Sequence, residues 1–211
     1  MENYFFMRPL LRLLAQGPFM CKATSMMLRV FAALIILGSL ASFFNAGKAI
    51  FELPTTSAIM GGILFQLFFI VAIYAVTHVL LIRAQDIEDL QVMSVGDIYM
   101  LPLGAVLLRM LGEAYSSFIG LIAIGGGIYV WFTSKNIGTI LGPLTAFFPA
   151  MLEASFIGGI QFMLTGILIA IGALIASYML AEIISLIARS ARLSVHTPRQ
   201  LPRQGIKTRV G

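Results

Sequence analysis

The sequence predicts an all-α integral membrane protein with four transmembrane helices in two antiparallel hairpins. Hydrophobic residues make up 59% of the chain and charged residues only 11%, whereas soluble domains carry about 25% charged residues. Four apolar stretches of 19 to 24 residues match the roughly 20 residues that a helix needs to cross a bilayer. The predicted spans are residues 28–50, 59–82, 114–132 and 157–180.

The distribution of basic residues predicts the orientation of these spans. Twelve of the fourteen lysines and arginines lie on one side of them, and only Lys48 and Lys135 lie on the other. By the positive-inside rule, both termini and the middle loop are expected in the cytoplasm. From the composition, we expect the membrane to be a bacterial inner (plasma) membrane. The net charge of +5 is therefore a topology signal, and nucleic acid is not an expected partner.

Residues 1–24 are predicted to form a cytoplasmic amphipathic segment ahead of the four-span membrane domain at 25–188. Aromatic and leucine side chains mix there with Arg8 and Arg12, which suits a short helix lying in the membrane interface. Docking of this helix on a partner subunit is the alternative. Cys21 is the only cysteine, so no intramolecular disulfide is expected.

The first hairpin joins residues 28–50 and 59–82 through a short outer loop. Gly38, Ser42 and Ala46 recur at four-residue spacing in the first span. Small residues at this spacing let helix backbones approach closely, so the stripe predicts a helix-packing surface. The other interpretation is that small residues are simply common in membrane helices.

The second hairpin repeats this pattern of small residues, and we expect them to pack helices as well. A glycine triple at 125–127 makes the outer half of the third span easy to pack closely or to deform. The predicted packing residues of this hairpin are Gly112, Ser116, Gly120, Gly166 and Ala170.

Residues 136–155 are apolar but hold two prolines and two glycines within 138–149, which argues against a regular span. An outer interfacial loop is the first interpretation. A re-entrant segment is the second, and it requires protein or water to satisfy its backbone.

The two hairpins resemble each other, which suggests an internal duplication. The first span opens with Leu28-Arg29, and the same pair of residue types, Leu108-Arg109, stands just before the third span. Gly61-Gly62 opens the second span as Gly158-Gly159 opens the fourth. Repeats of two spans each would share one topology and be related by an axis along the membrane normal.

Ionisable residues gather near the cytoplasmic ends of the spans, where charge is costly unless it faces protein or water. Arg109 and Glu113 are four residues apart and are expected to form an ion pair on one helix face. A contact between subunits and a proton or ion path are the alternatives. The possible intramembrane polar network comprises His78, Arg83, Arg109, Glu113 and Glu182.

Residues 189–211 form a basic cytoplasmic tail. Its charges suit anionic lipid head groups on the cytoplasmic side, or an acidic partner. The residues predicted to make this contact are Arg189, Arg192, Arg199, Arg203, Lys207 and Arg209.

The sequence holds no catalytic or cofactor-binding motif that we identify, since two histidines and one cysteine offer no metal-ligand spacing. We therefore expect a non-enzymatic subunit or scaffold of a larger inner-membrane complex, with no cofactor and with lipids and other membrane-protein subunits as partners. The alternative is a small channel or carrier for ions or protons, in which His78 and Glu113 would titrate.

Overall fold

The computed structural model describes residues 17–93, 100–134 and 154–196 of the chain. Four long helices make up nearly all of these residues. They are α2 (Gly17–Phe51), α3 (Thr56–Met93), α4 (Met100–Thr133) and α6 (Phe156–His196). Each is long and apolar enough to cross a membrane, so the predicted four spans in two antiparallel hairpins are confirmed, and the protein is an integral membrane protein.

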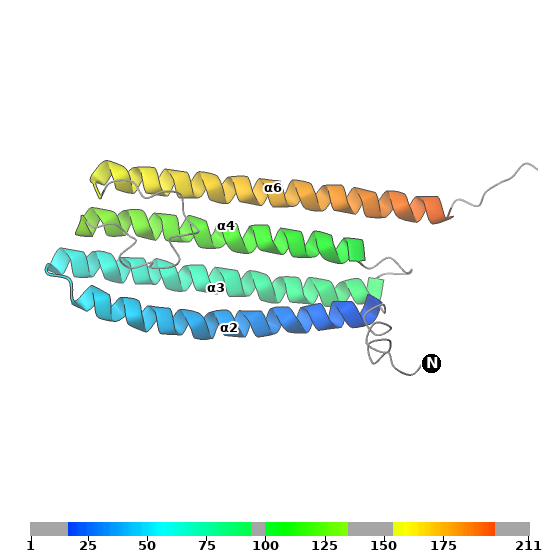
Figure 1. Ribbon diagram of the computed structural model, residues 1–211, viewed down its shortest axis with the longest axis horizontal. Helices are drawn as coiled ribbons and strands as arrows, with labels where there is room; N and C mark the ends of the chain where they lie inside the picture. The colour runs from blue at the N-terminus through cyan, green and yellow to red at the C-terminus, as the bar shows by residue number, and fades with distance from the viewer. Residues whose placement is uncertain (1–16, 94–99, 135–153, 197–211) are drawn as a thin grey trace, which may run out of the picture.

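The helices lie side by side in chain order and alternate in direction (Figure 1). Extensive contacts join α2 to α3, α3 to α4, and α4 to α6. The arrangement is therefore a row whose edges are α2 and α6, and it does not close into a four-helix bundle. We call the end where residues 52–55 join α2 to α3 the loop end, and the opposite end the network end.

The helices are longer than the predicted spans. They contain 34 to 41 residues, or about 50–60 Å at 1.5 Å per residue, against about 30 Å of hydrocarbon. The third helix begins at Met100 and not near residue 114, with Pro102 in its first turn, where a proline is tolerated. Likewise α2 begins at Gly17, so residues 17–24 are continuous with the first span.

Local signals explain where several helices begin and end. The Ala58 amide donates to the Thr55 hydroxyl at 3.3 Å, and the Gly158 amide donates to the Ser155 hydroxyl at 3.0 Å. Both are N-cap contacts, which satisfy amides that have no partner within the helix. After α4, Ser134 has a φ of 49°, the left-handed conformation in which many helices end.

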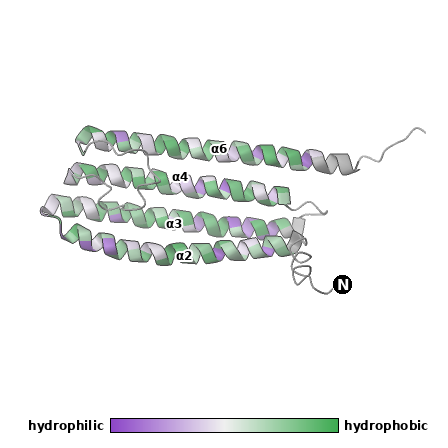
Figure 2. Cartoon of the chain, viewed as in Figure 1, coloured by the Kyte–Doolittle hydropathy of each residue, from purple (hydrophilic) through white to green (hydrophobic). Residues whose placement is uncertain are grey.

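Glycines allow the closest helix contacts in the row. A Cβ on Gly127 of α4 would lie 2.8 Å from the carbonyl oxygen of Gly159 on α6, and a Cβ on Gly159 would lie 3.0 Å from that of Gly127. The two backbones therefore touch, as in other small-residue membrane contacts. Green residues recur along each helix among white and purple ones (Figure 2). The buried cluster between the helices is apolar, with Phe65, Ile119 and Tyr129 among its side chains.

Two predicted segments lie outside the described residues. These are residues 1–16 of the amphipathic segment expected at 1–24 and most of the loop or re-entrant segment expected at 136–155. Residues 17–24 of the first segment are part of α2, so the break expected at Gly17-Pro18 does not occur there. The suggested duplication stays a prediction.

Candidate functional site

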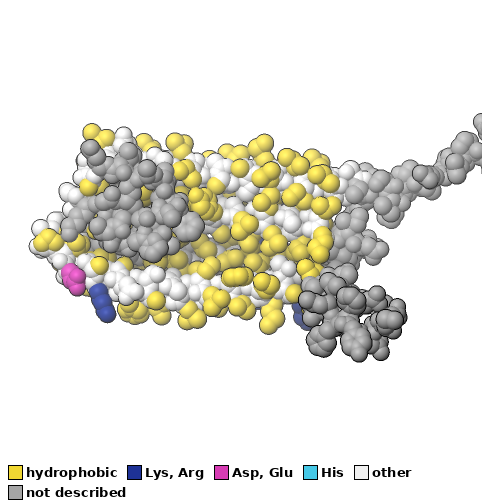
Figure 3. Space-filling view, viewed as in Figure 1, with side chains coloured by type: hydrophobic (Ala, Val, Ile, Leu, Met, Phe, Trp, Pro, Cys, Tyr) yellow, Lys and Arg dark blue, Asp and Glu magenta, His cyan; other side chains and the backbone are white. Residues whose placement is uncertain are grey.

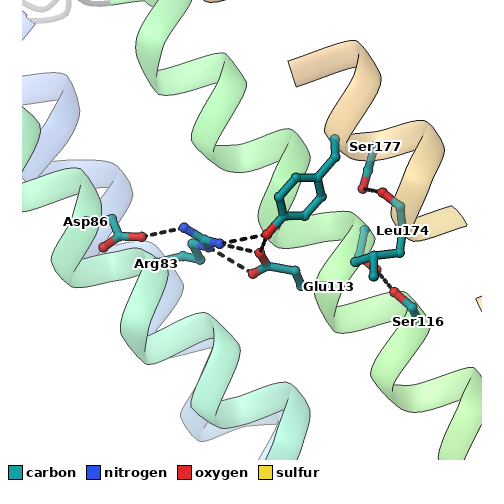
Figure 4. Close-up of polar contacts among 8 residues, drawn as sticks. Arg83, Asp86, Glu113, Ser116, Leu174 and Ser177 are labelled. Atoms are coloured by element: carbon teal, nitrogen blue, oxygen red, sulfur yellow. Dashed lines mark hydrogen bonds and ion pairs between the residues drawn. The ribbon is translucent and has the colours of Figure 1, made fainter. Parts of the chain in front are cut away.

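Charged side chains of α3 and α4 meet at the network end, and a tyrosine of α6 joins them. Arg83 of α3 donates from Nε to Oε2 of Glu113 on α4 at 2.9 Å, and its Nη2 pairs with the other carboxylate oxygen. Its Nη1 donates to Asp86 at 2.6 Å. Figure 4 shows the Arg83 guanidinium between the two carboxylates. The side chains of Arg83 and Glu113 are only 20% and 17% exposed, so this ion pair is largely shielded.

Tyr178 connects α6 to the same cluster. Its hydroxyl donates to Oε1 of Glu113. The guanidinium carbon of Arg109 lies 5.5 Å from the centre of the Tyr178 ring, which is a cation–π distance. We call Arg83, Asp86, Arg109, Glu113 and Tyr178 the charged seam. Its two arginines balance its two carboxylates, so the seam is neutral as a whole.

A second, more exposed contact joins α2 to α3 at this end. Arg29 Nη2 lies 2.9 Å from Glu88 Oε2, and the Ser25 hydroxyl donates to Glu88 Oε1 at 2.8 Å. The Arg29 and Glu88 side chains are 51% and 42% exposed. With the charged seam, this contact gives every pair of neighbouring helices a polar link at the network end.

Because that second ion pair is exposed, its removal should matter little. We expect Arg29→Met to change the free energy of unfolding by less than about 1 kcal/mol, the usual range for exposed pairs. Denaturant unfolding of the purified protein in mixed micelles would measure this. A loss of several kcal/mol would mean that α2 depends on this pair for its place in the row.

The depth of the seam explains why charges can lie there. Glu113 is 20 residues from the end of α4 at Thr133, or about 30 Å at 1.5 Å per residue. A hydrocarbon layer about 30 Å thick that begins at the loop end would therefore end near Glu113. Charges at that boundary reach water or head groups on one side and neighbouring helices on the other.

The structure brings together three of the five residues predicted for a polar network. Arg83, Arg109 and Glu113 meet in the charged seam, but the expected ion pair between Arg109 and Glu113 does not form in the described part of the chain, where Glu113 pairs with Arg83. His78 is exposed and stacks on Tyr74, with ring centroids 5.7 Å apart. Glu182 is exposed on α6.

Of the predicted tail residues, only Arg189 has a described side chain, and it is exposed near the end of α6. Arg192 lies in the last turns of α6, and the description covers only its backbone. The others lie outside the described residues. They are Arg199, Arg203, Lys207 and Arg209.

The predicted packing residues divide into two groups. Those of the second hairpin lie between α4 and α6: a Cβ on Gly112 would meet the Ser177 side chain, a Cβ on Gly166 would meet Ala123, and one on Gly120 would lie 3.6 Å from Ala170. Ser116, a half-buried residue on α4, donates its hydroxyl to the Gly112 carbonyl.

The stripe of Gly38, Ser42 and Ala46 on α2 does not lie between α4 and α6. No described atom outside the helix lies within 4 Å of a Cβ built on Gly38. Ser42 is exposed and donates to the Gly38 carbonyl at 3.1 Å, while Ala46 is half-buried. Most of this stripe therefore takes no part in contacts among the described helices.

Sequence reasoning missed Tyr178 and the partner of Arg29. Tyr178 lies directly after Ser177 near the end of an apolar run, where a tyrosine is ordinary at a membrane interface. The predicted topology placed Arg29 and Glu88 at the same side of the membrane, and this is the sequence feature from which their contact could have been suggested.

Chemically, the seam holds neighbouring helices together. Its carboxylates are occupied by arginines and a tyrosine hydroxyl, and within the described ranges no three metal-binding side chains cluster. No protein-family model, curated protein or solved structure matches the chain.

Proposed function

We propose that the protein is a non-enzymatic subunit or scaffold of a larger membrane complex, and that it contacts a partner subunit through the network end of α6. The proposal includes the predicted placement in a bacterial inner membrane with both termini in the cytoplasm. It rests on one observation, which is the length of the apolar surface of α6.

That surface is longer than the hydrocarbon layer of a bilayer. Large apolar side chains are exposed along α6 from Phe156 to Ile187, a distance of about 47 Å at 1.5 Å per residue. Even a tilt of about 40°, the upper end of the usual range, would leave about 36 Å along the membrane normal against about 30 Å of hydrocarbon. Ile183, Leu186 and Ile187 are at least half exposed, and they lie beyond the level of the seam.

Apolar side chains beyond the hydrocarbon favour burial against protein, because exposed apolar patches of this kind mark interaction sites. The open row supports the same proposal, since α6 has a neighbour among the described helices on one side only. The seam fits this role because it holds the helices of the subunit in place while an edge helix remains available.

A photo-crosslinking amino acid at Leu186 tests the proposal in native membranes. We expect a discrete adduct with a different protein, and we expect the same partner to copurify in fixed stoichiometry after gentle extraction. Leu168 is the matched control, since it is 68% exposed on the same helix but lies at hydrocarbon depth, where lipid adducts should dominate. Absence of a protein adduct at Leu186, or an adduct only with a second copy of this chain, would contradict the proposal.

The channel alternative has less support. Its two titrating groups do not meet among the described residues, because the His78 ring is exposed against Tyr74 while Glu113 is held by Arg83 and Tyr178. Proton flux in liposomes that is lowered by His78→Ala or Glu113→Gln would nevertheless restore it.

A further inference from the structure

A groove lies between α2 and α3 at the loop end. Its volume is about 630 Å³. Gly47 helps to form it, since a Cβ there would lie only 3.2 Å from Nε2 of Gln66. The missing side chain lets Gln66 of α3 reach the α2 backbone, where it donates to the Phe43 carbonyl at 3.1 Å. The groove is lined by Phe43, Phe44, Gly47, Lys48, Phe51, Glu52 and Gln66.

A second groove of about 210 Å³ continues along the same two helices toward the bilayer centre. Phe43 lines both grooves, so they adjoin at this side chain, and we call the two together the track. The deeper part is apolar except for Ser39, whose hydroxyl is bonded to the Ile36 carbonyl of its own helix at 2.8 Å. The deeper groove is lined by Ile36, Ser39, Leu40, Phe43, Phe69, Ile70 and Ile73.

The track has the length and the polarity of a phospholipid. From Ile36 to Phe51 along α2 is about 22 Å at 1.5 Å per residue, and Glu52 follows directly. One leaflet of a bilayer, head groups included, is about 20–22 Å thick. The charged residues lie at the loop end of the track and the apolar ones toward the middle of the membrane, which is the order of head group and acyl chain in a lipid of that leaflet.

The charges at the head of the track are of both signs, and neither is in an ion pair with another described residue. Lys48 is exposed in the last turn of α2, and Glu52 is exposed directly after the helix ends at Phe51. Among the described residues, the three ion pairs all lie at the network end, and neither Lys48 nor Glu52 belongs to one. On the face in Figure 3, described charged side chains of opposite sign lie near each other at this end of the molecule. A head group that carries both a phosphate and an ammonium group complements this pair.

We propose that the α2–α3 track binds a phospholipid with a phosphoethanolamine head group, in the leaflet at the loop end. Lys48 donates to the phosphate oxygens, and Glu52 accepts from the primary ammonium group. Phe43 and Phe44 flank the glycerol and the upper acyl chain, which continues along Leu40 and Ile70. This site is separate from the proposed partner surface on α6.

Native mass spectrometry of the purified protein with equal amounts of phosphatidylethanolamine, phosphatidylcholine and phosphatidylglycerol tests the proposal. We expect one retained lipid, with phosphatidylethanolamine preferred. Lys48→Gln and Glu52→Gln should each weaken its binding about tenfold, since one charge-assisted hydrogen bond is lost in each. Lys22→Gln is the matched control, because Lys22 is an exposed lysine at the other end of the same helix.

A second pair of variants tests the acyl-chain part of the track without touching the charges. Ser39→Phe should fill the deeper groove and reduce lipid retention about tenfold. Ala41→Phe, an exposed position on α2 outside both grooves, should leave it unchanged. Equal retention by the Lys48 and Glu52 variants and the unsubstituted protein would overturn the proposal. Absence of bound lipid, or equal binding of phosphatidylglycerol or phosphatidylcholine, would overturn it as well.

Discussion

Replacing Glu113 by alanine should lower the free energy of unfolding by about 3 kcal/mol, the scale of a broken buried ion pair. The substitution leaves Arg83, which is only 20% exposed, with Asp86 as its remaining carboxylate partner, and it removes the acceptor of the Tyr178 hydroxyl. Close to hydrocarbon, the loss of the more shielded of two carboxylate partners is costly even though Asp86 remains. Unfolding by a strong detergent in mixed micelles would measure the loss.

Two variants make this expectation specific. Glu88→Ala removes a carboxylate of the same row that is 42% exposed and that also accepts from the buried Ser25 hydroxyl, and it should cost about 1 kcal/mol, clearly less than Glu113→Ala. The double variant Arg83→Met/Glu113→Leu replaces both charges by apolar groups, and its stability should return to within about 1 kcal/mol of the unsubstituted protein. If Glu113→Ala were as stable as the unsubstituted protein, the charged seam would not be a structural link.

Replacing Gly112 by leucine should also destabilise the protein by about 3 kcal/mol, at the upper end of what overpacking costs. Even a Cβ at this position would overlap the Ser177 side chain on α6, and Ser177 is only 7% exposed. The two helices must therefore separate or rotate. The same unfolding measurement would detect the effect.

Gly38→Leu is the matched control, because no described atom outside the helix lies within 4 Å of its Cβ position. We expect its unfolding free energy to stay within about 0.5 kcal/mol of the unsubstituted protein, as for other surface substitutions. The Gly112→Ala variant should be rescued by Ser177→Gly, which removes the side chain that the new Cβ meets. A Gly112→Leu protein of unchanged stability would contradict the close α4–α6 contact.

The Gly38 variant also separates two roles of small residues. If it keeps its stability but loses copurifying proteins, the exposed stripe on α2 contacts another subunit. If it keeps both, the stripe faces lipid, and the proposed complex depends on α6 alone.

The number of spans and their pairing into hairpins could be predicted from the sequence, because apolar length and short connections are properties of single segments. The helix caps at Thr55 and Ser155 are local in the same sense. The helix ends were predicted only as bilayer-length spans, whereas the helices continue through flanking segments such as residues 100–113, because hydropathy marks the part of a helix that lies in hydrocarbon and not where the helix ends.

What the tertiary structure decided is the rotation of each helix and therefore every contact between helices. A helix that is apolar all round has no polar face to mark its outer side. The sequence thus places Arg83, Arg109 and Glu113 at one end of the protein. The rotation of α3 and α4 about their axes determines that Arg83 is the partner of Glu113. The same rotations turned Gly112 toward α6 and left Gly38 outside, although the two stripes have the same four-residue spacing.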